Sequence, residues 1–344
     1  MIPSWGGRFD GIIGVLAGIE IAQCLAEQGI RWEHPFEVID FLSEESSDYG
    51  ISCVGSRAFS GSLDAAMLDS QNSVGETLAE AISRIGGTPA ELTQPLRKPQ
   101  SIAAFIELHI EQGPVLESLD YPIGVVTNIV GIRRVRIVVT GQPDHAGTTP
   151  MDIRRDALVG AARIIDEAYR MASQMSGNPS YVVATVGHLE MTPNVANAVP
   201  GHVALTLEVR SDNQVILDTF PEQLLATVAS GLTALRLSTQ VTHLTRAKPT
   251  PCSDVVMEAI ELAANKLDYA NIRLPSGAGH DAVYVSPLGP TGMVFIPCLN
   301  GRSHCPEEWI ESQQLWRGTQ VLYQALTELD GILISPERSL LSSG

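Results

Sequence analysis

Hydrophobic and polar positions along the chain alternate between helix-like and strand-like stretches. Apolar residues recur at helical spacing in 11–28, 73–85, 254–267 and 313–329. Short runs rich in apolar and β-branched residues predict strands in 35–42, 105–110 and 292–297. Helices and strands that follow one another in this way predict an α/β fold.

The middle of the chain has a different order of elements. Strands are predicted in 132–140, 181–189, 202–210 and 238–244, and helices in 155–175 and 217–235. The resulting order β-α-β-β-α-β is typical of a ferredoxin-like domain. Pro249-Thr250-Pro251 then marks a boundary. We therefore expect a domain of residues 128–245 inserted into a second domain formed by 1–127 and 246–344, with a loose tail at 335–344.

Composition narrows the function classes. The chain has 344 residues, 44% of them hydrophobic, which is enough for two domains with buried cores. A net charge of −17 disfavours nucleic acid and anionic membranes as partners, and no apolar run is long enough to span a bilayer. Five cysteines without a CxxC pair disfavour zinc ribbons and disulfide frameworks, so a reducing cytoplasm is expected.

Candidate chemistry comes from acids and histidines in Gly- or Pro-rich segments. They are Asp10 in GGRFDG, Glu44-Glu45 in FLSEES, His109 in ELHIEQGPVLE and His304 in GRSHCPEEW. Imidazoles and carboxylates without a thiolate motif suit Zn, Mn or Co. At an extended strand end Glu44 and Glu45 would point in opposite directions, so only a turn there lets both reach one site.

Each candidate also has a plainer interpretation. Asp10 can be a turn residue, Glu44-Glu45 a solvated surface pair, His109 a core histidine and His304 an ordinary loop residue. Spacing alone does not decide between these interpretations, because no compact metal motif is present.

Several segments in one order carry a family resemblance. They are GGRFDGIIGVLAG, SEES followed by CVGSRAFSG, LHIEQGPVLE, DHAGTTPMDIRRDA, PNVANAVPG with a later EVRSD, SGAGHDA and GRSHCPEE. Together they resemble the M20-like amidases, which include N-carbamoyl-L-amino-acid hydrolase, allantoate amidohydrolase and β-ureidopropionase. The resemblance extends from residue 6 to about Trp309.

The resemblance implies a metal-dependent catalytic domain with an inserted lid and dimerisation domain. It implies two divalent ions, Zn or Mn, with Co and Ni as alternatives. Among the metal ligands, Asp10 bridges both ions, His109 binds the first, and Glu45 and His304 bind the second. Glu44 is implied as the general base. The residues implied to hold the substrate are Gln112, His145, Asn197 and Arg210. His145 can also donate a hydrogen bond to the oxyanion, and Arg210 can bind a carboxylate in a bidentate fork.

The sequence departs from the family pattern at its start. A further histidine ligand of the family, in an H-x-D motif, would fall just before Met1, and the Asp of that motif would fall at Met1. We therefore expect an N-terminally incomplete catalytic domain whose first-metal site lacks one histidine. A truncated start and a genuine remnant both explain this departure. In SGAGHDA, His280 and Asp281 can either orient a ligand or cap the helix that follows.

The hypothesis is a homodimeric hydrolase that cleaves a C–N bond in a linear carbamoyl or ureido compound bearing a carboxylate. Within the same family, an aminopeptidase or aminoacylase is the alternative. A catalytically inactive chain that acts as a binding protein is the alternative from another class.

Overall fold

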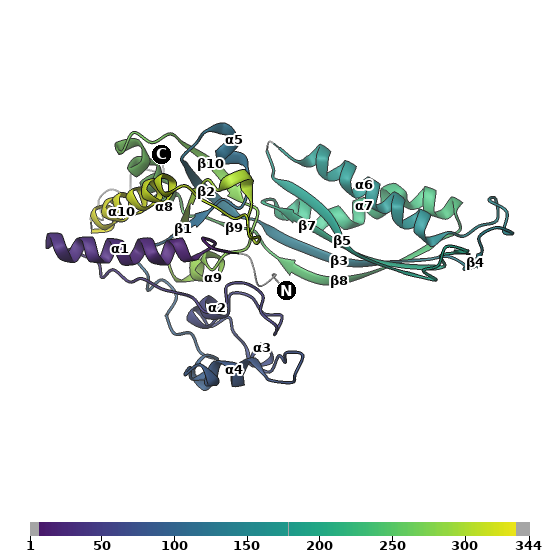
Figure 1. The fold of residues 1–344 in the computed structure, drawn as a ribbon, viewed down its shortest axis with the longest axis horizontal. Helices are drawn as coiled ribbons and strands as arrows, with labels where there is room; N and C mark the ends of the chain where they lie inside the picture. Colours follow the sequence, from purple (N-terminus) through teal and green to yellow (C-terminus); the bar gives the residue numbers. More distant parts are fainter. Residues whose placement is uncertain (1–6, 178, 335–344) are drawn as a thin grey trace. The chain divides into compact units, whose positions relative to one another are not determined.

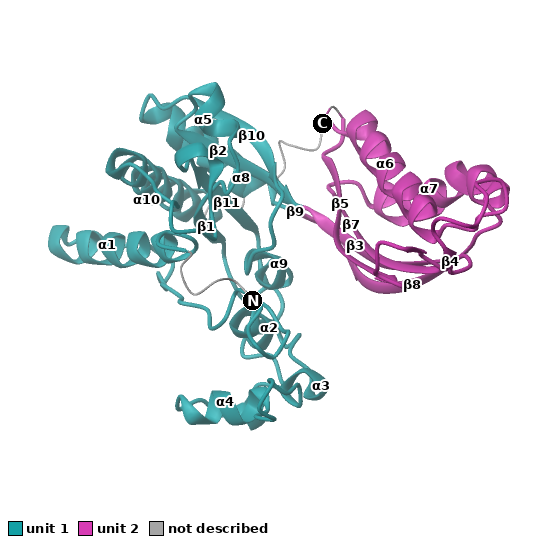
Figure 2. Ribbon diagram, turned by 45° about the vertical axis from the view of Figure 1, so that its right-hand side comes forward, with its two compact units in different colours: residues 1–129, 251–344 teal, residues 130–250 magenta. Residues whose placement is uncertain are grey.

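The computed structural model describes residues 7–177 and 179–334, which form two compact units (Figure 2). Unit 1 combines the residues up to Ile129 with those from Pro251 onward, and unit 2 is Val130–Thr250. The inserted unit thus begins and ends within a few residues of the expected range 128–245. The predicted loose tail at 335–344 lies outside the described residues.

A mixed sheet forms the centre of unit 1 (Figure 1). The elements of unit 1 are α1 (Ile12–Gln28), α2 (Val54–Ser60), α3 (Ala65–Leu68), α4 (Leu78–Arg84), η1 (Pro89–Glu91), β1 (Phe105–Ile110), α5 (Val115–Leu119), β2 (Ile123–Ile129), β9 (Thr250–Pro251, at the boundary), α8 (Asp254–Lys266), β10 (Asn271–Ser276), α9 (Ala282–Val285), η2 (Ser286–Leu288), β11 (Thr291–Ile296), η3 (Leu299–Gly301) and α10 (Ser312–Ile334). The strands lie in the order β1, β11, β2, β10, with β9 beside β2. The β1–β11 and β2–β10 pairs are parallel, and the β11–β2 pair is antiparallel.

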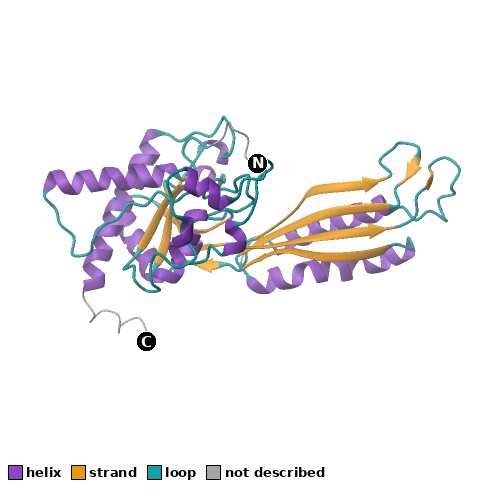
Figure 3. Ribbon diagram, turned by 90° about the horizontal axis from the view of Figure 1, so that it is seen from below, coloured by secondary structure: helices purple, strands orange, loops and turns teal. Residues whose placement is uncertain are grey.

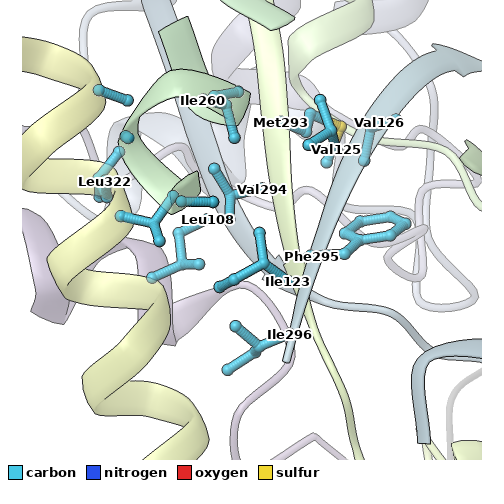
Figure 4. Close-up of a cluster of buried hydrophobic side chains, with 14 of the residues drawn as sticks. Leu108, Ile123, Val125, Val126, Ile260, Met293, Val294, Phe295, Ile296 and Leu322 are labelled. Atoms are coloured by element: carbon cyan, nitrogen blue, oxygen red, sulfur yellow. The ribbon is translucent and has the colours of Figure 1, made fainter. Parts of the chain in front are cut away.

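The core of unit 1 surrounds β11, whose six residues are all buried. Helices α8, α9 and α10 all pack against this strand. Leu108, Ile123, Val294 and Ile296 from the sheet cluster with Leu322 of α10 (Figure 4). A strand buried on both faces needs a continuous apolar run, which is what TGMVFI supplies.

Unit 2 has the predicted ferredoxin-like order of elements. Its elements are β3 (Gly131–Thr140), β4 (Asp144–His145), α6 (Ala157–Met175), β5 (Val182–Thr192), β6 (Ala198–Val199), β7 (His202–Ser211), α7 (Gln214–Ala234) and β8 (Ser238–Ala247). The antiparallel sheet has the order β5, β7, β3, β8, and α6 and α7 cover one face of it (Figure 3). Val135, Ile137 and Val139 alternate with more accessible residues because only that face is covered. The predicted α/β fold class with an inserted ferredoxin-like domain is confirmed.

The prediction of a strand at 35–42 is wrong. This segment is not assigned to any strand, and within the described ranges it pairs with none. It lines a cavity of about 1000 Å³ that is also lined by β1. A strand is defined by hydrogen bonds to a neighbouring strand, so the strand-like composition of PFEVIDFL is not sufficient.

The helix predicted at 73–85 begins later, at Leu78. The Thr77 hydroxyl accepts a hydrogen bond from the Glu80 amide at 3.1 Å, and the Thr77 amide donates to the Glu80 carboxylate at 2.8 Å. This capping box satisfies two amides at the helix start, so it fixes the start there. Strands β2 and β10 were not predicted. Among the described residues, no helix combines the length and apolarity needed to cross a membrane.

Replacing Leu205 of β7 with alanine should destabilise unit 2 by about 2–5 kcal/mol, because it leaves a cavity in the core. Leu205 is 0% exposed, whereas Leu244 of β8 in the same sheet is 51% exposed. Leu244→Ala is the matched control and should change the unfolding free energy by at most about 0.5 kcal/mol. Urea denaturation followed by circular dichroism measures both variants. Equal destabilisation would contradict this placement of the core.

Candidate metal centre

Asp10 lies in a glycine-flanked loop immediately before α1. Gly7 and Gly11 have φ angles of 86° and 76°, in the left-handed region that favours glycine. One carboxylate oxygen of Asp10 lies 3.0 Å from Nε2 of His109, and the other lies 2.9 Å from Nε2 of His304. The two rings therefore face the two oxygens of one carboxylate.

His109 lies near the end of β1 and is 4% exposed. Its Nδ1 is 2.8 Å from the carbonyl oxygen of Ile110, so the Nδ1 proton has an acceptor. That arrangement directs Nε2 toward Asp10 and is the orientation usual for a metal-binding imidazole.

His304 and Glu45 complete a compact group with Asp10. Nε2 of His304 is 2.8 Å from a carboxylate oxygen of Glu45, and donor atoms of all three residues lie within 4.8 Å of one another. His304 has a φ of 56°, a backbone conformation that residues other than glycine adopt rarely. Strained backbone of this kind is concentrated at functional sites.

A turn at Ser43, with a φ of 53°, resolves how Glu44 and Glu45 share one site. The carbonyl oxygens of Ser43 and Glu44 accept hydrogen bonds from the amides of Val54 and Cys53, at 3.1 and 2.8 Å. Glu44 and Glu45 consequently line the same cavity as Asp10. The segment is thus a turn rather than a strand end.

Burial and charge shift the acid–base properties of these groups. Burial raises the pKa of Glu44 to about 8, together with the negative charges of Asp281, Glu45 and Glu107. Burial also opposes charge on His109, but its hydrogen bond to Asp10 and the charges of Glu107 and Asp10 outweigh this and raise its pKa to about 9. Burial likewise acts to raise the pKa of Asp10, but its contacts with His109, Gln112 and His304 lower it below the ordinary value.

Gln112 was predicted to hold the substrate, and the structure places its side-chain amide against Asp10 and His304. Its Nε2 donates to both oxygens of Asp10, at 3.0 and 2.8 Å, and lies 3.2 Å from Nε2 of His304. The Oε1 atom is buried and has no hydrogen-bond partner within the described part of the chain. A buried acceptor of this kind is available to a ligand N–H.

His280 and Asp281 have separate contacts. The His280 ring lies 4.7 Å from the His109 ring, and its Nε2 is 2.7 Å from the Ser276 hydroxyl. Asp281 precedes α9, but its side chain makes no capping hydrogen bond and instead accepts one from Ser56 at 2.5 Å. The capping alternative is therefore wrong.

In unit 2, His145 lies in β4 and is exposed. Its Nδ1 accepts hydrogen bonds from the amides of Gly147 and Thr148, at 3.1 and 3.2 Å. The proton of a neutral ring is then on Nε2, which makes this atom a hydrogen-bond donor. Asn197 is also exposed, and its backbone carbonyl oxygen accepts a hydrogen bond from the amide of Ala146.

Arg210 lies far along β7 from His145 and Asn197. His202, at the start of β7, pairs with Thr140 at the end of β3 and with Thr192 at the end of β5. The β4–β6 pair, which contains His145, follows these two strand ends. From His202 to Arg210 the strand rises about 26 Å. Within one chain, the structure therefore does not bring Arg210 together with His145 and Asn197.

The family comparison agrees with these motifs. Residues 6–328 match Peptidase family M20/M25/M40. The chain is 38% identical to N-carbamoyl-L-amino-acid amidohydrolase of Paenarthrobacter aurescens over 326 residues, which cover 94% of this chain and 78% of that protein. A probable allantoate deiminase of Oryza sativa subsp. japonica is 31% identical, with 90% of this chain and 69% of that protein covered.

A solved structure is also similar. The amidase of the hydantoinase/carbamoylase family from Burkholderia multivorans superposes with a TM-score of 0.85 at 36% identity. The similarity covers 95% of this chain and 78% of that one. The chain belongs to the M20/M25/M40 family. The resemblance inferred from the motifs is confirmed.

This M20-family chain contains a second group of possible metal-binding side chains, of which the motifs did not indicate Glu107. Glu107, His109 and His280 also bring one donor atom each within 4.8 Å of one another. Glu107 precedes His109 by two positions in β1, so both side chains lie on the same side of the strand. The strand alternation in FIELHI was the signal that could have identified Glu107.

The donor set fits divalent cations. Oxygen and imidazole donors converge without a thiolate, and the two oxygens of Asp10 each face a different ring. The raised pKa of His109 and the lowered pKa of Asp10 favour a proton on the imidazole beside the carboxylate. A divalent cation can replace such a proton, because metal binding requires deprotonated ligands.

Replacing His304 with alanine removes a donor from the Asp10–Glu45–His304 group. We expect the affinity for Mn²⁺ or Zn²⁺ to fall by at least about 100-fold, since even residues that only support a ligand are worth about 10–100-fold. His188→Ala is the control, because the side chain of His188 is 60% exposed in unit 2. Isothermal titration calorimetry measures both variants. Wild-type affinity in His304→Ala would show that the ion binds elsewhere.

Proposed function

We propose that this chain is a dinuclear-metal amidohydrolase that cleaves a C–N bond in a linear carbamoyl or ureido compound. The proposed substrates are N-carbamoyl-L-amino acids or allantoate. The observation that supports this most is the carboxylate of Asp10, whose two oxygens each face a different imidazole. The names of the relatives, amidohydrolase and allantoate deiminase, support the choice of substrate.

The proposed ligands divide between two ions. Asp10 would be shared by both ions, His109 would hold the first, and Glu45 and His304 would hold the second. The ions are Zn or Mn, with Co and Ni as alternatives, since all accept oxygen and imidazole donors. When bound, such ions polarise a carbonyl and lower the pKa of a water molecule.

Glu44 is the proposed general base. It lines the same cavity as the ligands but does not belong to either group of clustered donors. Positive charge from bound ions would oppose the rise of its pKa to about 8 and keep it ionised at a lower pH. The ionised carboxylate takes a proton from the attacking water while the new C–O bond forms. It then delivers that proton to the departing nitrogen as the C–N bond breaks. For a carbamoyl substrate, cleavage of the C–N bond to the amino acid releases the amino acid and carbamate, and the carbamate breaks down to ammonia and carbon dioxide.

Glu44→Gln should lower kcat for ammonia release by about 10²–10⁴-fold, because it removes the proton acceptor. The assay uses the metal-loaded protein with N-carbamoyl-L-amino acids, N-carbamoyl-β-alanine and allantoate, alongside acyl-amino acids and dipeptides. Glu91→Gln, at an exposed position in η1, is the control. Equal ammonia release by Glu44→Gln and wild type would eliminate this role. Cleavage of only the peptides or acyl-amino acids would favour the aminopeptidase or aminoacylase alternative.

Arg210 is the proposed partner of the substrate carboxylate. Its Nε donates to Glu208 at 2.8 Å, and Glu208 also accepts from Arg134. Glu208 thereby orients the guanidinium group of Arg210, which suits bidentate binding of a carboxylate. His145, through Nε2, is the proposed donor to the oxyanion, and Asn197 offers an amide to the substrate.

The separation along β7 supports a homodimer. About 26 Å lies between the two ends of this strand, which is longer than a carbamoyl amino acid. A single lid therefore cannot bring Arg210 and His145 to the same small substrate. We propose that one subunit supplies Arg210 and its partner supplies His145 and Asn197, as the closed symmetry of a dimer permits.

Mixing two inactive variants tests this arrangement. Arg210→Ala and His145→Ala should each lose most activity as pure dimers. In randomly mixed dimers half are heterodimers with one intact site each, so about a quarter of the wild-type activity should return. Co-expression with two affinity tags isolates the heterodimers, whose ammonia release should be about half that of the wild type. Heterodimers without recovered activity would show that each site uses one subunit only.

A further inference from the structure

Glu308 connects the segment that carries Asp10 to the segment that carries His304. We propose that Glu308 is a positioning residue, which sets the separation of these two ligands through backbone hydrogen bonds. The inference rests on the proposed metal centre. No motif or comparison above assigns Glu308 a role.

The contacts of Glu308 extend to both segments. One carboxylate oxygen accepts hydrogen bonds from the amides of Phe9 and Asp10, at 2.7 and 3.1 Å. The other oxygen accepts from the amide of His304, at 3.2 Å. The two oxygens of one side chain thus bind the backbone of both ligand segments, almost 300 positions apart in sequence.

Burial makes these hydrogen bonds difficult to replace. Glu308 is 0% exposed, which is rare for a carboxylate. Within residues 7–177 and 179–334, the ion pairs include none with Glu308, and three backbone amides donate to its carboxylate instead. A buried charge without such donors is strongly unfavourable. The carboxylate therefore keeps all three amides directed at it, and this fixes the two segments relative to each other.

The segments themselves supply little rigidity. Asp10 and His304 both lie outside helices and strands, and the His304 backbone has a φ of 56°. Regular hydrogen bonding therefore does not hold either ligand in place. A left-handed backbone at a histidine persists only when surrounding contacts maintain it. The bond from the His304 amide to Glu308 is such a contact.

The neighbouring residue provides a matched comparison. Glu307 has a side chain that is 59% exposed, and it forms a surface ion pair with Arg302 at 3.2 Å. The two glutamates are adjacent and chemically identical, but among the described residues only Glu308 accepts hydrogen bonds from the amides of Phe9, Asp10 and His304. Substitution at Glu307 thus changes the same charge without changing the backbone of Asp10 or His304.

Glu308→Gln replaces one carboxylate oxygen with an NH₂ group, which donates hydrogen bonds and cannot accept one from an amide. At least one of the three backbone amides therefore loses its acceptor. We expect Mn²⁺ or Zn²⁺ to bind about 10–100-fold more weakly, the usual cost of losing a residue that supports a ligand. Calorimetry on the purified protein measures this affinity. In the metal-free protein, the amides of Phe9, Asp10 and His304 should exchange hydrogen for deuterium faster. Glu307→Gln should match the wild type in both measurements.

Four outcomes separate the possibilities. Weaker metal binding by Glu308→Gln, with faster exchange confined to the amides of Phe9, Asp10 and His304, supports a positioning role, whereas weaker binding with faster exchange throughout unit 1 contradicts it. Wild-type metal affinity in a folded Glu308→Gln overturns the inference and leaves the metal centre standing. Absence of metal binding by the wild type overturns the metal centre and the inference with it. If Glu308→Gln does not fold, Glu308→Asp is judged by the same criterion, since its shorter side chain cannot reach both segments.

Discussion

The contact of one carboxylate with two imidazoles is the interaction on which the candidate metal centre of unit 1 depends. Asp10 faces His109 from the sheet and His304 from a loop near the C-terminal helix, and Gln112 donates to both of its oxygens. Removing one member would leave a buried charge without its partner, which is costly. The unusual backbone at Gln112 and His304, with φ angles of 58° and 56°, accompanies this convergence. Strained backbone is thus present where the donors meet.

The pattern of the sequence predicted most of the elements whose signal is local. Strand β1 and the longer elements of unit 2 (β3, α6, β5, β7, α7 and β8) were predicted to within a few residues, because alternation and helical spacing reflect burial on one face, whereas the two-residue strands β4 and β6 were not predicted. The segment 35–42 has the same kind of signal, yet it forms no strand, since pairing depends on a neighbour that local sequence does not specify. Strand β2 was missed because most of its residues are buried, so it lacks alternation, and β10 was missed because NIRLPS contains few residues that favour strands.

The candidate site was predictable to the extent that its residues are recognisable from motifs. Asp10, Glu45 and His304 do lie together, although they are far apart in sequence. Glu308 could not be identified in this way, because in GRSHCPEEW it is indistinguishable from its exposed neighbour Glu307. Only the fold shows which of two adjacent glutamates is buried. The separation of Arg210 from His145 likewise follows from the strand register, which no motif reports.

The insertion of unit 2 also constrains the order in which the chain can fold. Strands β1 and β2 precede the insertion, whereas their neighbours β11 and β10 follow it. On the ribosome, unit 2 has all its strands available before β10 and β11 are synthesised, so it can fold first as a unit. The sheet of unit 1 must wait for contacts of large sequence separation, which form slowly. Until then β1 and β2 lack β11 between them, and the nascent chain has apolar strands that a chaperone can bind.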